Sequence, residues 1–216
     1  MQSKTNTIKL LQILESHYGQ VKSFLDHKNE FQFLIAVILS AQTTDITVNQ
    51  VTPKLFAKYP DATSLKKADL EDIREIIHNV NYRNNKAKFL IETARMYDED
   101  FNNRMPESMD ELLKFPGVGR KVANVILGDH FQKIIGVVVD THIRRVSKRI
   151  GWTKSTNPTV IEKDLMKYWP KEYWVHTPKR LILIGREFCF PRKPNCINCP
   201  LNQYCEKRIE IVAKFN

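Results

Sequence analysis

The segment that most constrains the fold is residues 31–39 (FQFLIAVIL), in which eight of nine positions are apolar. A helix with this sequence would be hydrophobic on nearly every face, so other elements must surround it at the centre of a core. Elsewhere, apolar residues recur at helical spacing, as at Ile8, Leu11 and Leu14. A chain of 216 residues is long enough for one large domain or two small ones. The pattern predicts an all-α globular protein.

Capping residues predict where the helices begin and end. Gly19 is placed to end the first helix with a left-handed backbone, and Pro53 should kink or divide the helix that contains it. Residues 133–139 (KIIGVVV) have the composition of a strand. Because a lone strand cannot pair, we expect a buried connector there. Other helices should begin after or at polar capping residues, namely Asp45, Asp69, Ser108, Asp140, Asn157 and Thr177.

The charge balance favours a polyanionic partner. The chain has 34 Lys and Arg against 24 Asp and Glu, a net charge of +10. Phosphate contacts made by Lys and Arg release counterions, so nucleic acid is the natural candidate, although basic proteins without such a partner are common. The apolar run near the N-terminus is too short for a signal peptide or a membrane span. We therefore expect a cytoplasmic protein without a membrane anchor.

Residues 113–121 (LKFPGVGRK) join a short helix to an amphipathic one through a turn with two glycines. Gly117 and Gly119 permit a tight turn with positive φ and a close approach of the backbone. They also leave the first N–H groups of the next helix accessible, and such groups bind phosphate. The segment therefore indicates either a DNA-binding hairpin or an ordinary helical hairpin whose glycines only make the turn.

Lys121 lies in the first turn of the helix that follows this hairpin. The positive end of the helix dipole disfavours an ammonium group there and so favours the neutral amine, which is a nucleophile able to form a Schiff base. Asp140 is expected at another helix start, where it could accept a proton or stabilise positive charge on a sugar. The simpler alternatives are a lysine that touches phosphate and an aspartate that only caps its helix.

The four cysteines form the pattern C-x6-C-x2-C-x5-C at positions 189, 196, 199 and 205. Four thiolates in one short segment suit a tetrahedral Zn²⁺ or a [4Fe–4S] cluster, whereas disulfides fit a cytoplasmic protein poorly. The six residues between the first two cysteines include Arg192 and Lys193. This basic loop would be either a phosphate contact or a solvated loop.

Taken together, the motifs resemble the helix-hairpin-helix DNA glycosylase superfamily, and within it the endonuclease III family, over nearly the whole chain. The resemblance rests on residues 39–45 (LSAQTTD), 115–121 (FPGVGRK) with ANVIL behind them, 139–142 (VDTH) and the cysteine spacing. It implies a two-lobed all-α fold. Residues 22–134 would form a six-helix barrel domain with the helix-hairpin-helix, and residues 1–21 and 135–216 a helical [4Fe–4S] cluster domain.

The same resemblance implies the activity: a bifunctional base excision repair enzyme that removes damaged, oxidised pyrimidines and cuts the strand 3′ to the abasic site. Lys121 would attack C1′ of a flipped nucleotide while Asp140 stabilises the sugar, and the resulting Schiff base would undergo β-elimination. The substrate would be double-stranded DNA containing damaged bases or abasic sites, bound by a monomer associated with the nucleoid. Implied DNA contacts are Gln42, Tyr82, Pro116, Gly117, Val118, Gly119, Arg120, His142, Arg192 and Lys193.

Two features depart from the family pattern. Asn81 replaces the usual glycine before the residue that wedges into the duplex, and the wedge residue itself is Tyr82 rather than an aliphatic residue. Asparagine tolerates a left-handed backbone, so the turn should survive. The interval between Lys121 and Asp140 is also one residue longer than expected, which the loop between Gly128 and Gly136 should absorb.

Two other functions remain compatible with the sequence. One is a mismatch glycosylase of the same superfamily that removes thymine or uracil. The other is a non-catalytic DNA-binding module with a structural Cys₄ zinc site. The presence of both Lys121 and Asp140 disfavours the second, because a binding module needs no carboxylate at that point.

Overall fold

The computed structural model describes residues 2–133 and 136–207, and all the regular secondary structure within these ranges is helical. The predicted all-α fold is therefore confirmed. None of the helices in this part of the chain is long and apolar enough to cross a membrane. The α-helices are α1 (Lys4–Tyr18), α2 (Glu30–Ser40), α3 (Asp45–Lys58), α4 (Ala62–Leu65), α5 (Leu70–Ile76), α6 (Arg83–Glu99), α7 (Met109–Leu112), α8 (Arg120–Asp129), α9 (Thr141–Ile150), α10 (Pro158–Tyr168) and α11 (Thr177–Glu187).

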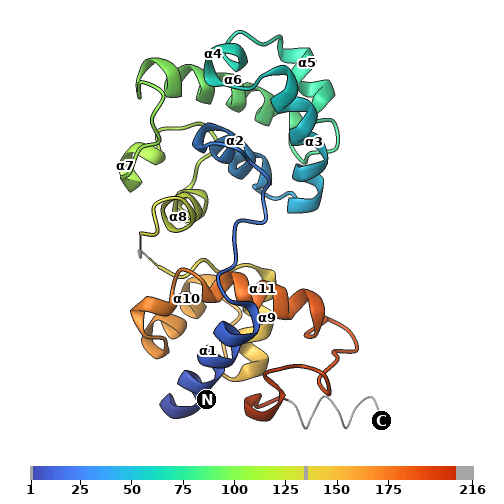
Figure 1. The fold of residues 1–216 in the computed structure, drawn as a ribbon, viewed down its shortest axis with the longest axis vertical. Helices are drawn as coiled ribbons and strands as arrows, with labels where there is room; N and C mark the ends of the chain where they lie inside the picture. Colours follow the sequence, from blue (N-terminus) through green and yellow to red (C-terminus); the bar gives the residue numbers. More distant parts are fainter. Residues whose placement is uncertain (1, 134–135, 208–216) are drawn as a thin grey trace. The chain divides into compact units, whose positions relative to one another are not determined.

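The chain divides into two compact units, each with its own hydrophobic core. The first consists of Ser23–Lys133 and contains α2 to α8 (Figure 1). Its centre is α2, in which every residue from Phe31 to Leu39 is buried, as the all-round apolar pattern predicts. Pro53 lies within α3, which continues past it to Lys58 without division. Burial of α2 on all sides fixes where its C-terminal end emerges.

The second unit is built from the chain before Ser23 and after Lys133, and contains α1 and α9 to α11. Leu10, Leu11 and Leu14 of α1 are fully buried in its core beside Trp152. Polar side chains tie the N-terminal segment to the rest: the Gln2 amide donates to the carbonyl oxygens of Ile150, at 2.8 Å, and Tyr204, at 2.6 Å. These contacts join the two ends of the described chain into one unit.

Most of the predicted helix starts are confirmed. Asp69, Ser108, Asp140 and Asn157 each accept a backbone N–H of the first turn, and α11 begins at Thr177. Gly19 ends α1 with φ 59°, which favours glycine. The start at Asp45 is wrong by one residue: Thr44 is the cap, because its hydroxyl accepts the Thr47 N–H at 3.2 Å.

The connector predicted for residues 133–139 lies partly outside the described residues, which omit 134 and 135. Residues 136–139 form no strand, in agreement with the prediction. The extra residue expected between Lys121 and Asp140 falls in an interval that includes the two undescribed positions, so its placement stays a prediction.

Candidate functional site

The hairpin connects α7 to α8 through residues 113–119. Phe115 and Val118 are buried in the core of the Ser23–Lys133 unit, and a backbone hydrogen bond from Val118 N–H to the Phe115 carbonyl, at 3.1 Å, closes the turn between them. Gly117 has φ 78°, and a Cβ there would lie 2.8 Å from Cδ2 of Phe89. Gly117 is therefore required both for its backbone conformation and for the close approach to α6.

Gly119 plays a different part, as the N-cap of α8. Its φ is −94°, which any residue can adopt, so the expectation of positive φ holds for Gly117 and is wrong for Gly119. No side chain caps the first turn of α8. The N–H groups there remain available to an anion, and the helix dipole adds to the attraction.

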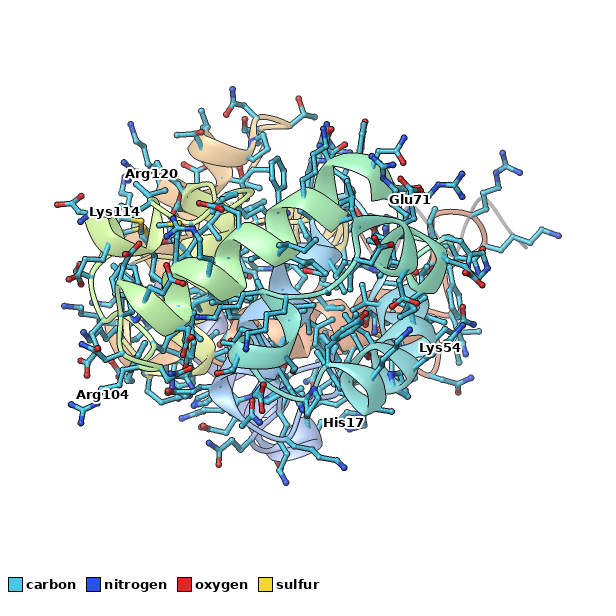
Figure 2. All side chains as sticks on the ribbon, turned by 90° about the horizontal axis from the view of Figure 1, so that it is seen from above. His17, Lys54, Glu71, Arg104, Lys114 and Arg120 are labelled. Atoms are coloured by element: carbon cyan, nitrogen blue, oxygen red, sulfur yellow. The ribbon has the colours of Figure 1, made fainter. Side chains whose placement is uncertain are left out.

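Two cationic side chains occupy the exposed first turn of α8. Arg120 and Lys121 are its first two residues, and both are solvent-exposed. The side chains of Lys114 and Arg120 project outward on the same side of their unit (Figure 2). The hairpin thus presents open N–H groups, positive charge and an accessible primary amine together, an arrangement that suits a phosphate and a nearby electrophilic carbon.

Asp140 belongs to the second unit, where it is the N-cap of α9. One oxygen, Oδ1, accepts the Ile143 N–H at 2.7 Å, and the side chain is half-buried. Two residues further on, Nδ1 of His142 lies 3.1 Å from a guanidinium nitrogen of Arg145. Because guanidinium only donates, His142 accepts through Nδ1 and carries its proton on Nε2. The cap therefore uses one carboxylate oxygen of Asp140, and Arg145 fixes the ring of His142.

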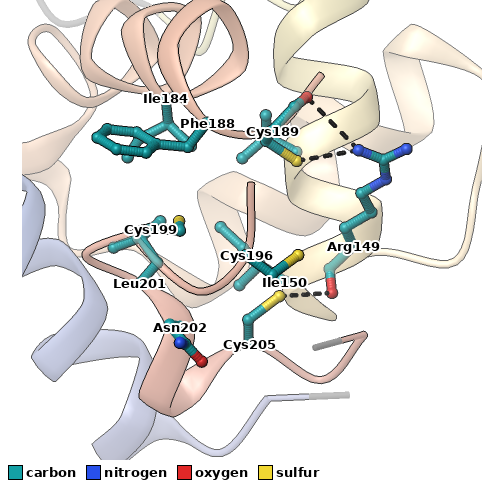
Figure 3. Close-up of a pocket in the computed structure, with 11 residues that line it drawn as sticks. Arg149, Ile150, Ile184, Phe188, Cys189, Cys196, Cys199, Leu201, Asn202 and Cys205 are labelled. Carbon is teal, nitrogen blue, oxygen red and sulfur yellow. Dashed lines mark hydrogen bonds between the residues drawn. The ribbon is translucent and has the colours of Figure 1, made fainter. Parts of the chain in front are cut away.

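The four cysteines line a single pocket next to α9 and α11 (Figure 3). Its other walls are largely apolar and include Ile150, Ile184 and Leu201. Burial raises the pKa of the Cys199 thiol to about 12, and a bound metal would offset this by stabilising the thiolate. The fold thus brings the four cysteines of the C-x6-C-x2-C-x5-C pattern together around one pocket.

The arrangement of these thiols bears on which metal group fits. Among the described residues, no three Cys, His, Asp or Glu side chains converge so as to hold a single metal ion. A Cys₄ zinc site requires such convergence, with each sulfur about 2.3 Å from one ion. A four-iron cluster instead takes one thiolate per iron at its corners and needs a larger cavity. Four thiols that line one pocket are the kind of ligand set that both groups use.

Arg149 holds the loop between the first two cysteines. Its guanidinium donates to the carbonyl oxygens of Phe190, at 2.7 Å, and Pro191, at 3.0 Å, and to Sγ of Cys189 at 3.2 Å. Arg145 donates to the Cys189 carbonyl from the preceding turn of α9. With its backbone fixed in this way, the loop leaves Arg192 and Lys193 exposed to solvent.

The structure brings Gln42 and Tyr82 together through Asn81. The Asn81 amide donates to the Gln42 carbonyl at 2.5 Å, and the Asn81 N–H donates to the Thr43 hydroxyl at 3.2 Å. Gln42 is exposed, and Tyr82 is 64% exposed, so Tyr82 does not pack into its unit. Both side chains therefore lie at the surface, on two turns that are hydrogen-bonded to each other.

The left-handed residue of this turn is Tyr82, with φ 58° and ψ 32°, and not Asn81 as expected. Asn81 is instead engaged through both its amide and its N–H, which fixes it against the loop after α2. Tyr82 then has to supply the reversal that starts α6. Gln42 is also left-handed, with φ 56°.

Sequence reasoning missed two residues that shape these sites, Lys86 and Arg149. Lys86 continues the buried stripe of α6 that includes Leu90, Ala94 and Tyr97, so a lysine on an apolar face was the available signal. Arg149 follows Arg145 at a spacing of four, which places both on the face of α9 that meets Cys189.

Comparison with known proteins agrees with this geometry. Residues 35–171 match the family model of the HhH-GPD superfamily base excision DNA repair proteins. The match includes the hairpin, Lys121 and Asp140. The class of protein that the fold and hairpin define is thus the helix-hairpin-helix base excision repair class.

Individual relatives narrow this class. The chain is 44% identical to an endonuclease III of Synechocystis sp., over 94% of this chain and 92% of the relative. It superimposes on a non-covalent endonuclease III–DNA complex with TM-score 0.87 and 37% identity, covering 99% of this chain and 100% of that one. A trapped endonuclease III–DNA covalent intermediate gives TM-score 0.86, also at 37% identity, covering 98% and 100%. The chain belongs to the endonuclease III family of base excision repair glycosylases with AP lyase activity.

The two glycines of the hairpin should respond differently to alanine. Gly117→Ala should destabilise the protein by about 1–3 kcal/mol, because the new Cβ meets Phe89 and the backbone is left-handed. Gly119→Ala has nothing within 4 Å of its Cβ and should cost at most about 1 kcal/mol. Urea unfolding of both variants tests this. Equal losses of stability would contradict the assigned role of Gly117.

Proposed function

We propose that this chain removes damaged pyrimidines from double-stranded DNA and then cleaves the strand 3′ to the abasic site, with Lys121 as the nucleophile. The observation that carries the proposal is an exposed lysine in the uncapped first turn of α8, at the end of the hairpin. A related endonuclease III was trapped as a covalent intermediate with DNA, which supports amine chemistry in the family.

Lys121 would act by nucleophilic substitution at C1′ of the flipped nucleotide. Its neutral amine forms a bond to C1′ as the glycosidic bond breaks and the base departs with the bonding electrons. Loss of a proton from nitrogen and opening of the sugar ring give the Schiff base. Removal of a C2′ proton then expels the 3′ phosphate.

We assign the essential carboxylate to Asp140, as the family resemblance implies. Its charge would stabilise the positive sugar as the base departs. The observed cap uses only Oδ1, so capping and catalysis are compatible roles for one side chain. His142, fixed by Arg145, is proposed as a DNA contact of the same helix.

For DNA binding we propose two groups of contacts besides Asp140 and His142. The hairpin, Pro116 to Arg120, would receive phosphate at the open N-terminus of α8. Gln42 and Tyr82 would enter the duplex, with Gln42 filling the space left by the flipped nucleotide and Tyr82 wedging beside it. We further propose that the Ser23–Lys133 unit is the six-helix barrel domain and that the other unit is the cluster domain.

The cofactor proposed for the cysteine pocket is a [4Fe–4S] cluster held by Cys189, Cys196, Cys199 and Cys205. When bound, it would supply a rigid, charged centre for folding and DNA docking. Arg149 would keep the loop after Cys189 in place through its hydrogen bonds, and this loop carries Arg192 and Lys193.

A mismatch glycosylase remains the second candidate because lesion choice depends on pocket shape. A thermostable thymine-DNA glycosylase shares the fold, with TM-score 0.77 and 23% identity. At that identity the likeness concerns the fold alone. The endonuclease III relatives at 37–44% identity favour pyrimidine damage over mismatches.

Lys121 and Asp140 should fail in distinguishable ways. Lys121→Ala should lower strand cleavage at an abasic site by on the order of a thousandfold or more, because the nucleophile is removed. Asp140→Asn keeps the helix cap, since Asn caps as well as Asp, and should slow base excision by about 10²–10³-fold without loss of stability. Single-turnover kinetics on a thymine-glycol duplex measure both steps.

Lys114→Ala serves as the matched control for Lys121, because Lys114 is an exposed lysine of the same hairpin. At saturating enzyme it should cleave abasic DNA at nearly the wild-type rate. Cleavage by Lys121→Ala at that same rate would remove Lys121 from the mechanism, and normal excision by Asp140→Asn would leave Asp140 as a helix cap only.

Metal analysis tests the cofactor. Protein purified without oxygen should be brown and contain about four iron atoms per chain. Cys199→Ser should lose iron and the near-ultraviolet circular dichroism of its segment, whereas Asn198→Ser, at the neighbouring exposed position, should retain both. One zinc ion per chain in colourless protein would refute the cluster.

Salt dependence tests the basic loop. Replacing Arg192 and Lys193 by Gln should reduce the slope of log affinity against log salt by about one unit for each phosphate that the loop neutralises in the wild type. The control variant replaces Lys163 and Lys167, two exposed lysines of α10, by Gln and should keep the wild-type slope. An unchanged slope in the first variant would place the loop away from DNA.

A further inference from the structure

Lys86 is a buried lysine whose side-chain hydrogen bonds all end on the last turn of α2 and the loop that follows it. It lies in the first turns of α6 with 4% of its surface exposed. Its ammonium group donates to the carbonyl oxygens of Leu39, at 2.7 Å, and Ala41, at 2.6 Å, and to the Thr43 hydroxyl at 3.0 Å. An ammonium group has three donors, so these three uncharged acceptors match its full capacity.

These acceptors belong to the end of α2 and the loop that carries Gln42. The last carbonyl groups of a helix lack partners within the helix, and a cation there also interacts favourably with the helix dipole. Lys86 supplies both the donors and the charge from α6, which packs against α2 in the same unit (Figure 1). It therefore fixes how the chain leaves α2.

The same lysine is bonded to the turn that carries Tyr82. The Lys86 backbone N–H donates to the Tyr82 carbonyl at 3.0 Å, a first-turn bond of α6 that does not depend on the side chain. The Thr43 hydroxyl, which accepts from the Lys86 ammonium, also accepts from the Asn81 N–H, and the Asn81 amide holds the Gln42 carbonyl. The Lys86 side chain is thus linked to the Tyr82 turn through the shared Thr43 hydroxyl, which joins two loops that are about 40 residues apart in sequence.

Both loops need external support. Gln42 and Tyr82 have left-handed backbones, with φ 56° and 58°, which side-chain-bearing residues adopt only when the surroundings impose it. Their side chains are exposed, so burial of those side chains does not impose it. The hydrogen bonds of Lys86, Thr43 and Asn81 instead hold the Gln42 carbonyl and the residues that flank Gln42 and Tyr82.

We propose that Lys86 is a positioning residue that holds Gln42 and Tyr82 in the geometry with which they enter the opened duplex. This inference rests on the proposed function. It assigns to Lys86 the pre-organisation of both side chains before DNA arrives, so that binding does not have to order them.

A direct chemical role for Lys86 does not fit its surroundings. Burial lowers the pKa of Lys86 to about 8, as befits a nucleophilic lysine. However, its nitrogen is enclosed and all three donors are engaged, so no substrate carbon can approach it. Arginine would not replace it either, because a planar fork does not match three convergent acceptors.

The first test uses protein without DNA. In Lys86→Met, amide hydrogen exchange should rise about tenfold or more in residues 40–44 and 81–83, because the network that protects them is removed. Thr43→Val, which keeps Lys86 and removes the shared hydroxyl, should raise exchange in both loops to a lesser extent. Lys67→Met is the matched control, an exposed lysine of the same unit, and should exchange like the wild type.

The second test compares DNA substrates. Lys86→Met should weaken binding to a lesion in duplex DNA by about tenfold or more. With the wild type, 2-aminopurine placed opposite the lesion should become more fluorescent as it unstacks. Lys86→Met should abolish this increase. Cleavage of an abasic site in single-stranded DNA, which needs no wedge, should stay within about twofold of the wild type. Adding Gln42→Ala to Lys86→Met should cause little further loss, because both changes remove the same interaction.

Two results for Lys86→Met would overturn the proposal. The first is amide exchange in both loops that matches the Lys67→Met control. The second is an equal loss of activity on duplex and single-stranded substrates, which would make Lys86 a general stability residue. If Lys86→Met proves too unstable, Thr43→Val decides by the same criteria. A wild-type protein that ignored lesions would instead refute the proposed function, while the exchange data would still decide whether Lys86 holds the two loops.

Discussion

Burial of α2 on every side fixes the position of its C-terminal end, and the loop that follows inherits that position. The helix is enclosed by the other helices of its unit, and its residues from Phe31 to Leu39 leave no face for solvent. Its terminal carbonyl groups must then find donors within the protein. Lys86 provides them, and in doing so sets the conformation of Gln42. The packing of one apolar helix is in this way connected to the part of the surface proposed to enter DNA.

Helix ends recur at each of the other proposed functional positions. Lys121 lies in the uncapped first turn of α8, Asp140 caps α9, and Cys189 follows the end of α11. Unpaired backbone groups and the partial charge of the dipole concentrate at such ends. These groups attract anions at helix N-termini, which is why phosphate binding and charge stabilisation are proposed there.

Much of this arrangement could be read from local sequence. The all-round apolar pattern predicted α2, and Asp140 and Asn157 were recognisable as caps because capping depends on neighbours three residues away. The hairpin glycines were also recognisable, although only Gly117 needs positive φ. The contacts of Lys86 and Arg149 were missed because they span 43 to 47 and 40 to 42 residues, and no local rule states which loop a side chain will reach. The shift of the left-handed residue from Asn81 to Tyr82 has the same origin, since the partners of Asn81 lie in another loop.

The proposed mechanism depends most on the identity of the residue that bonds to DNA. Wild-type protein reacted with abasic DNA in the presence of borohydride, then digested and sequenced by tandem mass spectrometry, would identify that residue directly. The mechanism predicts a reduced sugar adduct on the side chain of Lys121, in the peptide that begins α8. An adduct found at another amine, such as Lys114, or the absence of any adduct under conditions in which the strand is cut, would contradict it.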